Sequence, residues 1–143
     1  LRDKSFHKIT TEEFDQVMDV HFQGSFYASH AVYPIMREQN FGRIIFTTSS
    51  GGLCGNFGQA NYGAAKAGIA AFSVITAMEL VKYGVTVNCL APAAFTRMTA
   101  DLPGIVGTDE GAEEAMSPRW ISVITAWLCS EAAQNVNSWV PSA

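Results

Sequence analysis

Apolar residues recur at helical intervals over the first forty residues of the chain. Thr10 and Glu13 have the spacing of a capping box, in which two side chains cap the first turn of a helix. Apolar side chains then follow three to four positions apart, at Phe14, Val17 and Met18. The pattern predicts a helix from Thr11 to Asn40, with an irregularity near Gly24.

Two short apolar runs, each bounded by turn residues, predict buried parallel strands. They are RIIFTT, from Arg43 to Thr48, and VTVNCLAP, which begins at Val85. Between them, the alanine-rich segment from Ala60 to Tyr83 predicts a long helix, with Gly84 as its C-cap.

The last third of the chain has a weaker pattern. The segment from Ala93 to Met116 mixes glycine, proline and acidic residues, which is typical of an exposed loop. Ser117 and Pro118 then have the character of an N-cap and first helical residue. The apolar positions of this last expected helix are Trp120, Ile121, Ile124, Trp127 and Leu128.

Alternation of helices and strands predicts an α/β fold with a parallel sheet. In such sheets, ligands bind at the carboxyl ends of the strands. Ser49 and Pro92 both fall at these ends, so we expect them to line one crevice.

Candidate chemistry lies in the stretch SSGGLCGNFGQANYGAAKAG, which begins at Ser49. Tyr62 and Lys66 are four residues apart on the expected helix and therefore share a face. An ammonium beside a phenol stabilises the phenolate, so the pair is suited to acid–base catalysis. Ser49 is then placed to donate a hydrogen bond to a substrate oxygen.

Two other interpretations of these residues are weaker. A tyrosine and lysine at this spacing are more often a solvated helix face, but the serine and the glycine-rich loop before them make that interpretation weaker here. Nucleophilic serine catalysis fits less well, because the G-x-S-x-G elbow is absent.

Composition narrows the function further. The net charge of −4 comes from scattered residues, and no lysine or arginine run is present that would follow a nucleic acid backbone. The three cysteines, Cys54, Cys89 and Cys129, have no metal-ligand or disulfide spacing, so we expect reduced core thiols of an intracellular protein and no metal site. Glu79 and Lys82 interrupt the longest apolar run, which argues against membrane insertion.

Ser49, GQANYGAAKAG and VNCLAP together resemble the short-chain dehydrogenase/reductase family over nearly the whole chain. The resemblance implies a Rossmann-like, doubly wound parallel sheet with helices on both faces. It implies hydride transfer between NAD or NADP and a carbon that bears a hydroxyl or ketone. By position, Tyr62 would be the proton donor or acceptor, Lys66 would bind the nicotinamide ribose, and Ser49 would orient the substrate oxygen.

The chain departs from the usual family pattern at two places. VHFQG places His21 where most members have a catalytic asparagine, so His21 is a further catalytic candidate. APAAFTRM has Ala93 where a glycine is usual and Thr96 one residue early, so the nicotinamide contact passes to Thr96 or to the backbone of Pro92, Ala93 and Ala94.

Within the family, VHFQGSF, CGNFGQANY and RMT resemble the subgroup of the (3R)-hydroxyacyl-CoA dehydrogenase region of peroxisomal multifunctional enzyme type 2 and its bacterial relatives. This implies a 3-hydroxyacyl-CoA or steroid-type substrate, with a 3-oxoacyl-carrier-protein reductase as one alternative. It also implies a homodimer or homotetramer. The compartment would be the cytoplasm of a bacterium, or the peroxisome as one option in a eukaryote.

The family's pyrophosphate-binding turn, G-x-x-x-G-x-G, is absent from the twelve glycines of this chain. We therefore expect residues 1–143 to be the C-terminal portion of one dehydrogenase domain, without the N-terminal dinucleotide-binding half. The second alternative follows from this expectation: an inactive, truncated dehydrogenase that acts only as a structural or interaction module.

Overall fold

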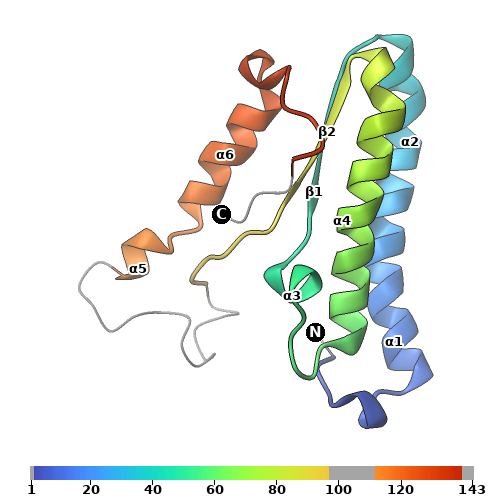
Figure 1. Cartoon of the computed structure of the whole chain (residues 1–143), viewed down its shortest axis with the longest axis vertical. Helices are drawn as coiled ribbons and strands as arrows, with labels where there is room; N and C mark the ends of the chain where they lie inside the picture. Colours follow the sequence, from blue (N-terminus) through green and yellow to red (C-terminus); the bar gives the residue numbers. More distant parts are fainter. Residues whose placement is uncertain (1, 97–111, 140–143) are drawn as a thin grey trace.

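Two parallel strands form the centre of the computed structural model, which describes residues 2–96 and 112–139. Strand β1 (Gly42–Thr47) pairs with strand β2 (Val85–Leu90), so that Gly42 lies opposite Val85 and Thr47 opposite Leu90. Both strands begin and end within two residues of the ranges expected from the sequence. Helices cover both faces of this pair, with α1, α2 and α4 on one side and α6 on the other (Figure 1).

The expected first helix is in fact three consecutive segments. Helix α1 (Thr11–Met18) begins with the predicted capping box, in which the Glu13 backbone N–H donates to the Thr10 hydroxyl. A π-helical turn, η2 (Asp19–Gln23), follows, and α2 (Gly24–Glu38) continues from it. The irregularity therefore precedes Gly24, and a π-turn of this kind is often found at functional sites.

Helix α4 (Ala60–Leu80) lies along the sheet and continues into a 3₁₀ turn, η3 (Val81–Tyr83). Gly84 then adopts a left-handed conformation, with φ of 68°, and a Cβ there would lie 2.5 Å from the carbonyl oxygen of Asn40. The predicted C-cap is confirmed, because both the backbone angle and the space require glycine.

Alternating side chains of the strands enter two hydrophobic clusters. Toward α4, the buried cluster consists of Ile44, Phe46, Ile69, Ala77, Leu80, Val85, Val87 and Cys89. Toward α6, Leu90, Leu128 and Ala133 are buried, with Ile45 packed against them. A strand with apolar residues on both faces reads as a continuous apolar run, which explains the sequence pattern.

The C-terminal elements are α5 (Ala112–Ala115), α6 (Arg119–Cys129) and the 3₁₀ turn η4 (Glu131–Ala133). The expected N-cap of α6 is wrong by one position: Pro118 is the N-cap, because the Trp120 amide bonds the Ser117 carbonyl in a turn before the helix begins. Beyond η4 the chain runs along β2, where the Ser138 amide donates to the carbonyl of Val87.

One further expectation is wrong, and the argument behind another needs correction. Only Cys89 is a buried thiol, whereas Cys54, which directly follows α3, and Cys129, which is the last residue of α6, are exposed. The segment Ala60–Tyr83 is long and apolar enough to cross a membrane by length and composition alone, despite its charged residues. We interpret it as a core helix, because its polar residues Asn61, Lys66 and Ser73 are buried within the fold.

Candidate active site

The carboxyl end of β1 is fastened to both β2 and α4 by Thr48, which is 2% exposed. Its backbone N–H donates to the carbonyl of Leu90 at 2.7 Å, and its hydroxyl donates to the carbonyl of Lys66 at 2.6 Å. The next residue, Ser49, is thereby held at the strand end. The Ser49 hydroxyl accepts a hydrogen bond from the Gly51 amide and caps the short helix α3 (Ser50–Leu53).

Glycines allow α3 to approach α4 closely. A Cβ on Gly52 would lie 2.6 Å from the Cβ of Lys66, and one on Gly63 would lie 3.2 Å from the carbonyl oxygen of Gly51. Side chains at these positions would therefore separate the two helices. Figure 1 shows α3 beside the first turns of α4. Ser49 is the N-cap of α3, and Tyr62 and Lys66 belong to the first two turns of α4.

Lys66 is 8% exposed, which is unusual for a lysine. Its ammonium donates to the carbonyl of Thr47 at 2.8 Å and lies 5.7 Å from the centroid of the Tyr62 ring. Burial lowers the pKa of Lys66 below its ordinary value, since a charge away from water is less favourable. The two side chains that the sequence placed on one helix face are therefore neighbours.

His21 contacts Tyr62 from a different element of the fold. It lies in the π-turn η2, and its ring meets that of Tyr62 edge to face, with centroids 5.3 Å apart and planes at 86°. Burial, followed by the nearby charge of Lys66, lowers the pKa of His21. The imidazole is therefore neutral at neutral pH and sits directly beside the phenol.

A groove of about 500 Å³ adjoins these residues and follows the outer edge of β1. His21 and Lys66 contribute to its lining, together with α2 residues such as Ser25 and Ser29. Among the described residues, β1 has no strand partner on this side. His21 and Lys66, two candidate catalytic residues, therefore border the same groove.

The expected nicotinamide-contact residues follow β2 directly. Ala91 is buried, and the segment from Pro92 to Thr96 continues from the carboxyl end of the strand without regular structure. The Phe95 amide donates to the carbonyl of Met116 at 2.7 Å, which fixes the segment toward the start of α6. Arg97, Met98 and Thr99 lie outside the described residues.

Sequence reasoning missed two polar residues at this site. Thr48 joins β1 to the Lys66 carbonyl, and Asn61, 0% exposed, binds the backbone of Tyr62. Thr48 was interpreted only as the end of a strand, and Asn61 only as part of a family motif. Their positions in the sequence could have indicated them, because each directly precedes a candidate catalytic residue.

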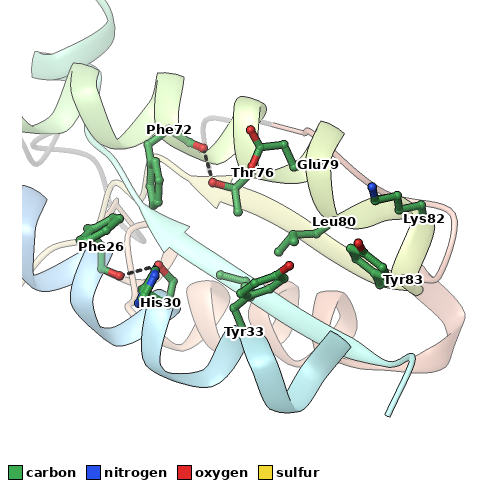
Figure 2. A pocket seen from close by; sticks show the side chains of 11 residues that line it. Phe26, His30, Tyr33, Phe72, Thr76, Glu79, Leu80, Lys82 and Tyr83 are labelled. Carbon is green, nitrogen blue, oxygen red and sulfur yellow. Dashed lines mark hydrogen bonds between the residues drawn. The ribbon is translucent and has the colours of Figure 1, made fainter. Parts of the chain in front are cut away.

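A second hollow, of about 390 Å³, lies between α2 and α4 and contains none of the candidate catalytic residues. Figure 2 shows Phe26, His30 and Tyr33 from α2 facing Phe72 and Thr76 from α4. The rings of Phe26 and Phe72 contact each other at a tilt of 59°, with 5.9 Å between their centroids. This hollow is a groove between two helices and is separate from the Tyr62 site.

Comparison with protein families finds that the family model described as short chain dehydrogenase matches residues 1–104. The chain is 41% identical over 143 residues to a Mycobacterium tuberculosis protein named as a short-chain type dehydrogenase/reductase, covering 98% of this chain and 48% of that protein. It is 37% identical over 148 residues to hydroxyacyl-CoA dehydrogenase ChsB1 of the same organism, covering 97% and 47%.

Two further relatives of the chain are named as a carrier-protein reductase and a peroxisomal enzyme. A 3-oxoacyl-[acyl-carrier-protein] reductase of Synechocystis is 44% identical over 102 residues, covering 71% of this chain and 41% of that protein. The solved structure of full-length peroxisomal multifunctional enzyme type 2 from Drosophila melanogaster superposes with a TM-score of 0.85 at 34% identity, covering 100% of this chain and 25% of that one. The chain thus spans about half the length, or less, of the relatives that it matches.

Proposed function

This chain belongs to the short-chain dehydrogenase/reductase family, and from that premise we propose that its protein is an NAD(P)-dependent oxidoreductase that interconverts a secondary alcohol and a ketone. One observation carries the proposal. Tyr62 is a neighbour of both a buried ammonium, Lys66, and a neutral imidazole, His21, and Lys66 binds the carbonyl of Thr47 at the carboxyl end of β1. This is where an α/β sheet binds its ligand.

In this proposal Tyr62 donates a proton to the carbonyl oxygen during reduction and takes it back during oxidation. The buried charge of Lys66 favours the phenolate that remains after donation, because charges interact strongly away from water. The Thr47 carbonyl holds the ammonium in place. Ser49, at the start of α3, orients the substrate oxygen by a hydrogen bond from its hydroxyl.

The residues present fit the nicotinamide end of such a cofactor. Within the described residues, the ammonium of Lys66 donates one hydrogen bond to the carbonyl of Thr47. Its other N–H groups are suited to donate to ribose hydroxyls. Pro92, Ala93, Ala94 and Thr96 would border the nicotinamide from the end of β2. When bound, the nicotinamide supplies or accepts the hydride, which the side chains of this chain cannot do.

His21 extends the catalytic set on the side away from α4. Its edge-to-face contact restricts the rotation of the Tyr62 ring, and a neutral imidazole can accept or donate a hydrogen bond at either nitrogen. We assign it the role of holding the phenol and exchanging protons with it.

The substrate we propose is a 3-hydroxyacyl-CoA or a steroid-type alcohol. Support comes from the similarity to ChsB1, whose name states hydroxyacyl-CoA dehydrogenase, over 97% of this chain. A 3-oxoacyl-carrier-protein reductase is the second candidate, favoured by the Synechocystis match. The two share the β-oxoacyl group and differ in the thioester carrier. Because relatives include bacterial and peroxisomal proteins, we propose an intracellular enzyme.

We also propose a homodimer or homotetramer in which α2 and α4 pack on their copies. Large apolar side chains on these helices face solvent, including Ile35 at 62%, Ile75 at 54% and Met78 at 71% exposure. The groove of Figure 2 lies on the same two helices, which gives a second copy a concave surface to fill.

The proposed function is tested by following NADH and NADPH absorbance with a 3-oxoacyl-CoA, the matching acyl-carrier-protein thioester and a steroid ketone. Oxidation of the cofactor by the CoA thioester, lost in Tyr62→Phe, supports the first candidate. Preference for the carrier-protein thioester supports the second. Absence of cofactor oxidation with all three substrates, in a folded full-length protein, contradicts both and favours an interaction module.

A further inference from the structure

Asn61 is fully buried and directly precedes Tyr62 on the first turn of α4. Its Oδ1 accepts the backbone N–H of Tyr62 at 2.8 Å. The first N–H groups of a helix have no acceptor within the helix, so the Asn61 side chain satisfies one of them. It does so at the residue whose phenol is proposed to transfer the proton.

The amide nitrogen of the Asn61 side chain binds the N-terminal residues of the chain. Nδ2 of Asn61 donates to the carbonyl of Arg2 at 3.3 Å. Residues Arg2–Lys4, here called the strap, bind the loop before Tyr62 at two more points. The Lys4 amide donates to the carbonyl of Gly58 at 2.9 Å, and Asp3 accepts a hydrogen bond from the Gln59 side chain at 2.8 Å.

The loop that the strap binds is mostly exposed, and within it Asn56 binds Gln59 through a side-chain and a backbone hydrogen bond. Gly55 and Gly58 both have φ of +81°, and Phe57 between them is 91% exposed. Few buried apolar contacts mean a low local stability, so hydrogen bonds decide where the loop lies. The strap is itself anchored, since Lys4 forms an ion pair with Glu13 on α1.

We propose that Asn61 is a positioning residue for Tyr62, and that it couples the strap to the start of α4. The inference rests on the proposed oxidoreductase function. Asn61 is not proposed to touch substrate; it sets the position of the Tyr62 backbone and, through it, the phenol relative to Lys66 and His21. An error of about 1 Å at such a group costs roughly 100-fold in rate.

Two substitutions separate the contacts. Asn61→Ala removes both, whereas Asn61→Asp keeps the acceptor for the Tyr62 amide and places a repelling oxygen against the Arg2 carbonyl. Ser73→Ala is the matched control, because Ser73 is 1% exposed on the same helix and donates to the Ala70 carbonyl, farther along α4 from Tyr62. Each variant is made in the full-length protein.

The expected kinetic result is a loss of kcat of about 10- to 100-fold in Asn61→Ala, a smaller loss in Asn61→Asp, and nearly unchanged KM in both. The pH dependence of kcat should also shift, because Tyr62 no longer lies correctly beside Lys66. Ser73→Ala should keep kcat and its pH profile. Equal effects of Asn61→Ala and Ser73→Ala, after correction for stability, would overturn the proposal.

Amide hydrogen exchange gives a readout that does not need activity. In Asn61→Asp, peptides covering residues 2–5 and 55–63 should exchange faster together, while Ser73→Ala leaves both unchanged. If Asn61→Asp leaves both peptides as in wild type, the coupling does not exist. An inactive wild-type protein would contradict the proposed function, and the exchange data would still decide the coupling.

Discussion

The ring of His21 lies edge to face against the ring of Tyr62, with 5.3 Å between their centroids. This contact joins the π-turn η2 to the start of α4, through two residues that are 41 positions apart in sequence. Lys66 is a buried cation close enough for its charge to lower the pKa of His21, so protonation of His21 would add a second positive charge to the site.

The first prediction concerns the acid limb of activity. Because burial and Lys66 lower the pKa of His21, the imidazole stays neutral down to a pH below the ordinary histidine value of about 6.5. We expect kcat/KM to fall as pH drops through that lowered pKa. His21→Asn should remove this acid limb while retaining activity, as measured by initial rates from pH 4.5 to 8. An unchanged limb in the variant would exclude His21 as its source.

The same group should influence stability in a defined direction. A histidine whose pKa is lower when folded binds fewer protons in the folded state than in the unfolded state. Its contribution is therefore fully present above about pH 6.5 and is lost as pH falls through the folded pKa. Urea unfolding of wild type and His21→Asn should thus diverge below that pH, with wild type losing more stability.

The second prediction concerns the phenol and the serine. Tyr62→Phe removes one hydroxyl, so it should keep the fold and lower kcat by about 100- to 10,000-fold. Ser49→Ala should lower kcat less, and it should also cost about 1 kcal/mol of stability because Ser49 caps α3. Steady-state rates with thermal unfolding measure both. A Tyr62→Phe enzyme with nearly normal turnover would remove Tyr62 from the mechanism.

The third prediction concerns the buried lysine. Lys66→Met should abolish activity and weaken cofactor binding, measured by calorimetry, because it removes the ammonium. The buried lysine should change the pH dependence of stability in the alkaline range, whereas His21 changes it in the acid range. The lowered pKa means that folded Lys66 loses its proton before the unfolded lysine, whose pKa is about 10.4. Between the two pKa values wild type should gain stability relative to Lys66→Met as pH rises. If the difference in stability between wild type and Lys66→Met does not change with pH, Lys66 does not carry a buried charge.

The fourth prediction concerns helix contact. A Cβ at Gly52 would lie 2.6 Å from the Cβ of Lys66, so Gly52→Ala should force α3 away from α4. The expected cost is about 1–3 kcal/mol, together with a loss of activity. Gly24→Ala is the control, since its Cβ would meet nothing nearer than 3.7 Å and alanine favours a helix by about 0.5–1 kcal/mol. Equal denaturation midpoints for the two variants would show that the contact is not tight.

The sequence was informative where local chemistry decides structure. The capping box at Thr10, the C-cap at Gly84 and both strands follow from rules that act within a few residues, and the structure confirms them. The π-turn η2 was not foreseen beyond an irregularity, because no local propensity distinguishes π from α geometry. It is nevertheless what places His21 against Tyr62.

Rules that act within a few residues cannot predict contacts between residues far apart in the sequence. The hydrogen bond from Asn61 to Arg2 joins residues with no periodic relation, and only the folded chain brings them together. Likewise, Cys54 and Cys129 were expected in the core because thiols are usually buried, yet both are exposed, one directly after α3 and the other at the end of α6. The pairing of Tyr62 with Lys66 was predictable, because spacing along one helix fixes it.

The last prediction concerns assembly. The apolar side chains of Ile75 and Met78 are three residues apart on α4, so they form one exposed strip beside the groove between α2 and α4. Met78→Lys with Ile75→Lys places charges on that strip without entering the core. We expect wild type at micromolar concentration to sediment as a dimer or tetramer, and the double variant to shift to a smaller species.

A control separates this interface from general solubility. Phe6 is 84% exposed on the 3₁₀ turn η1 (Phe6–Lys8), away from the groove, so Phe6→Lys should leave the sedimentation coefficient unchanged. If the α4 variant keeps the wild-type mass, the α2–α4 face is not the interface. A wild type that sediments strictly as a monomer would contradict the assembly itself. Because the groove and Tyr62 lie on separate surfaces, a dissociated variant that still turns over would show that the site needs no second copy.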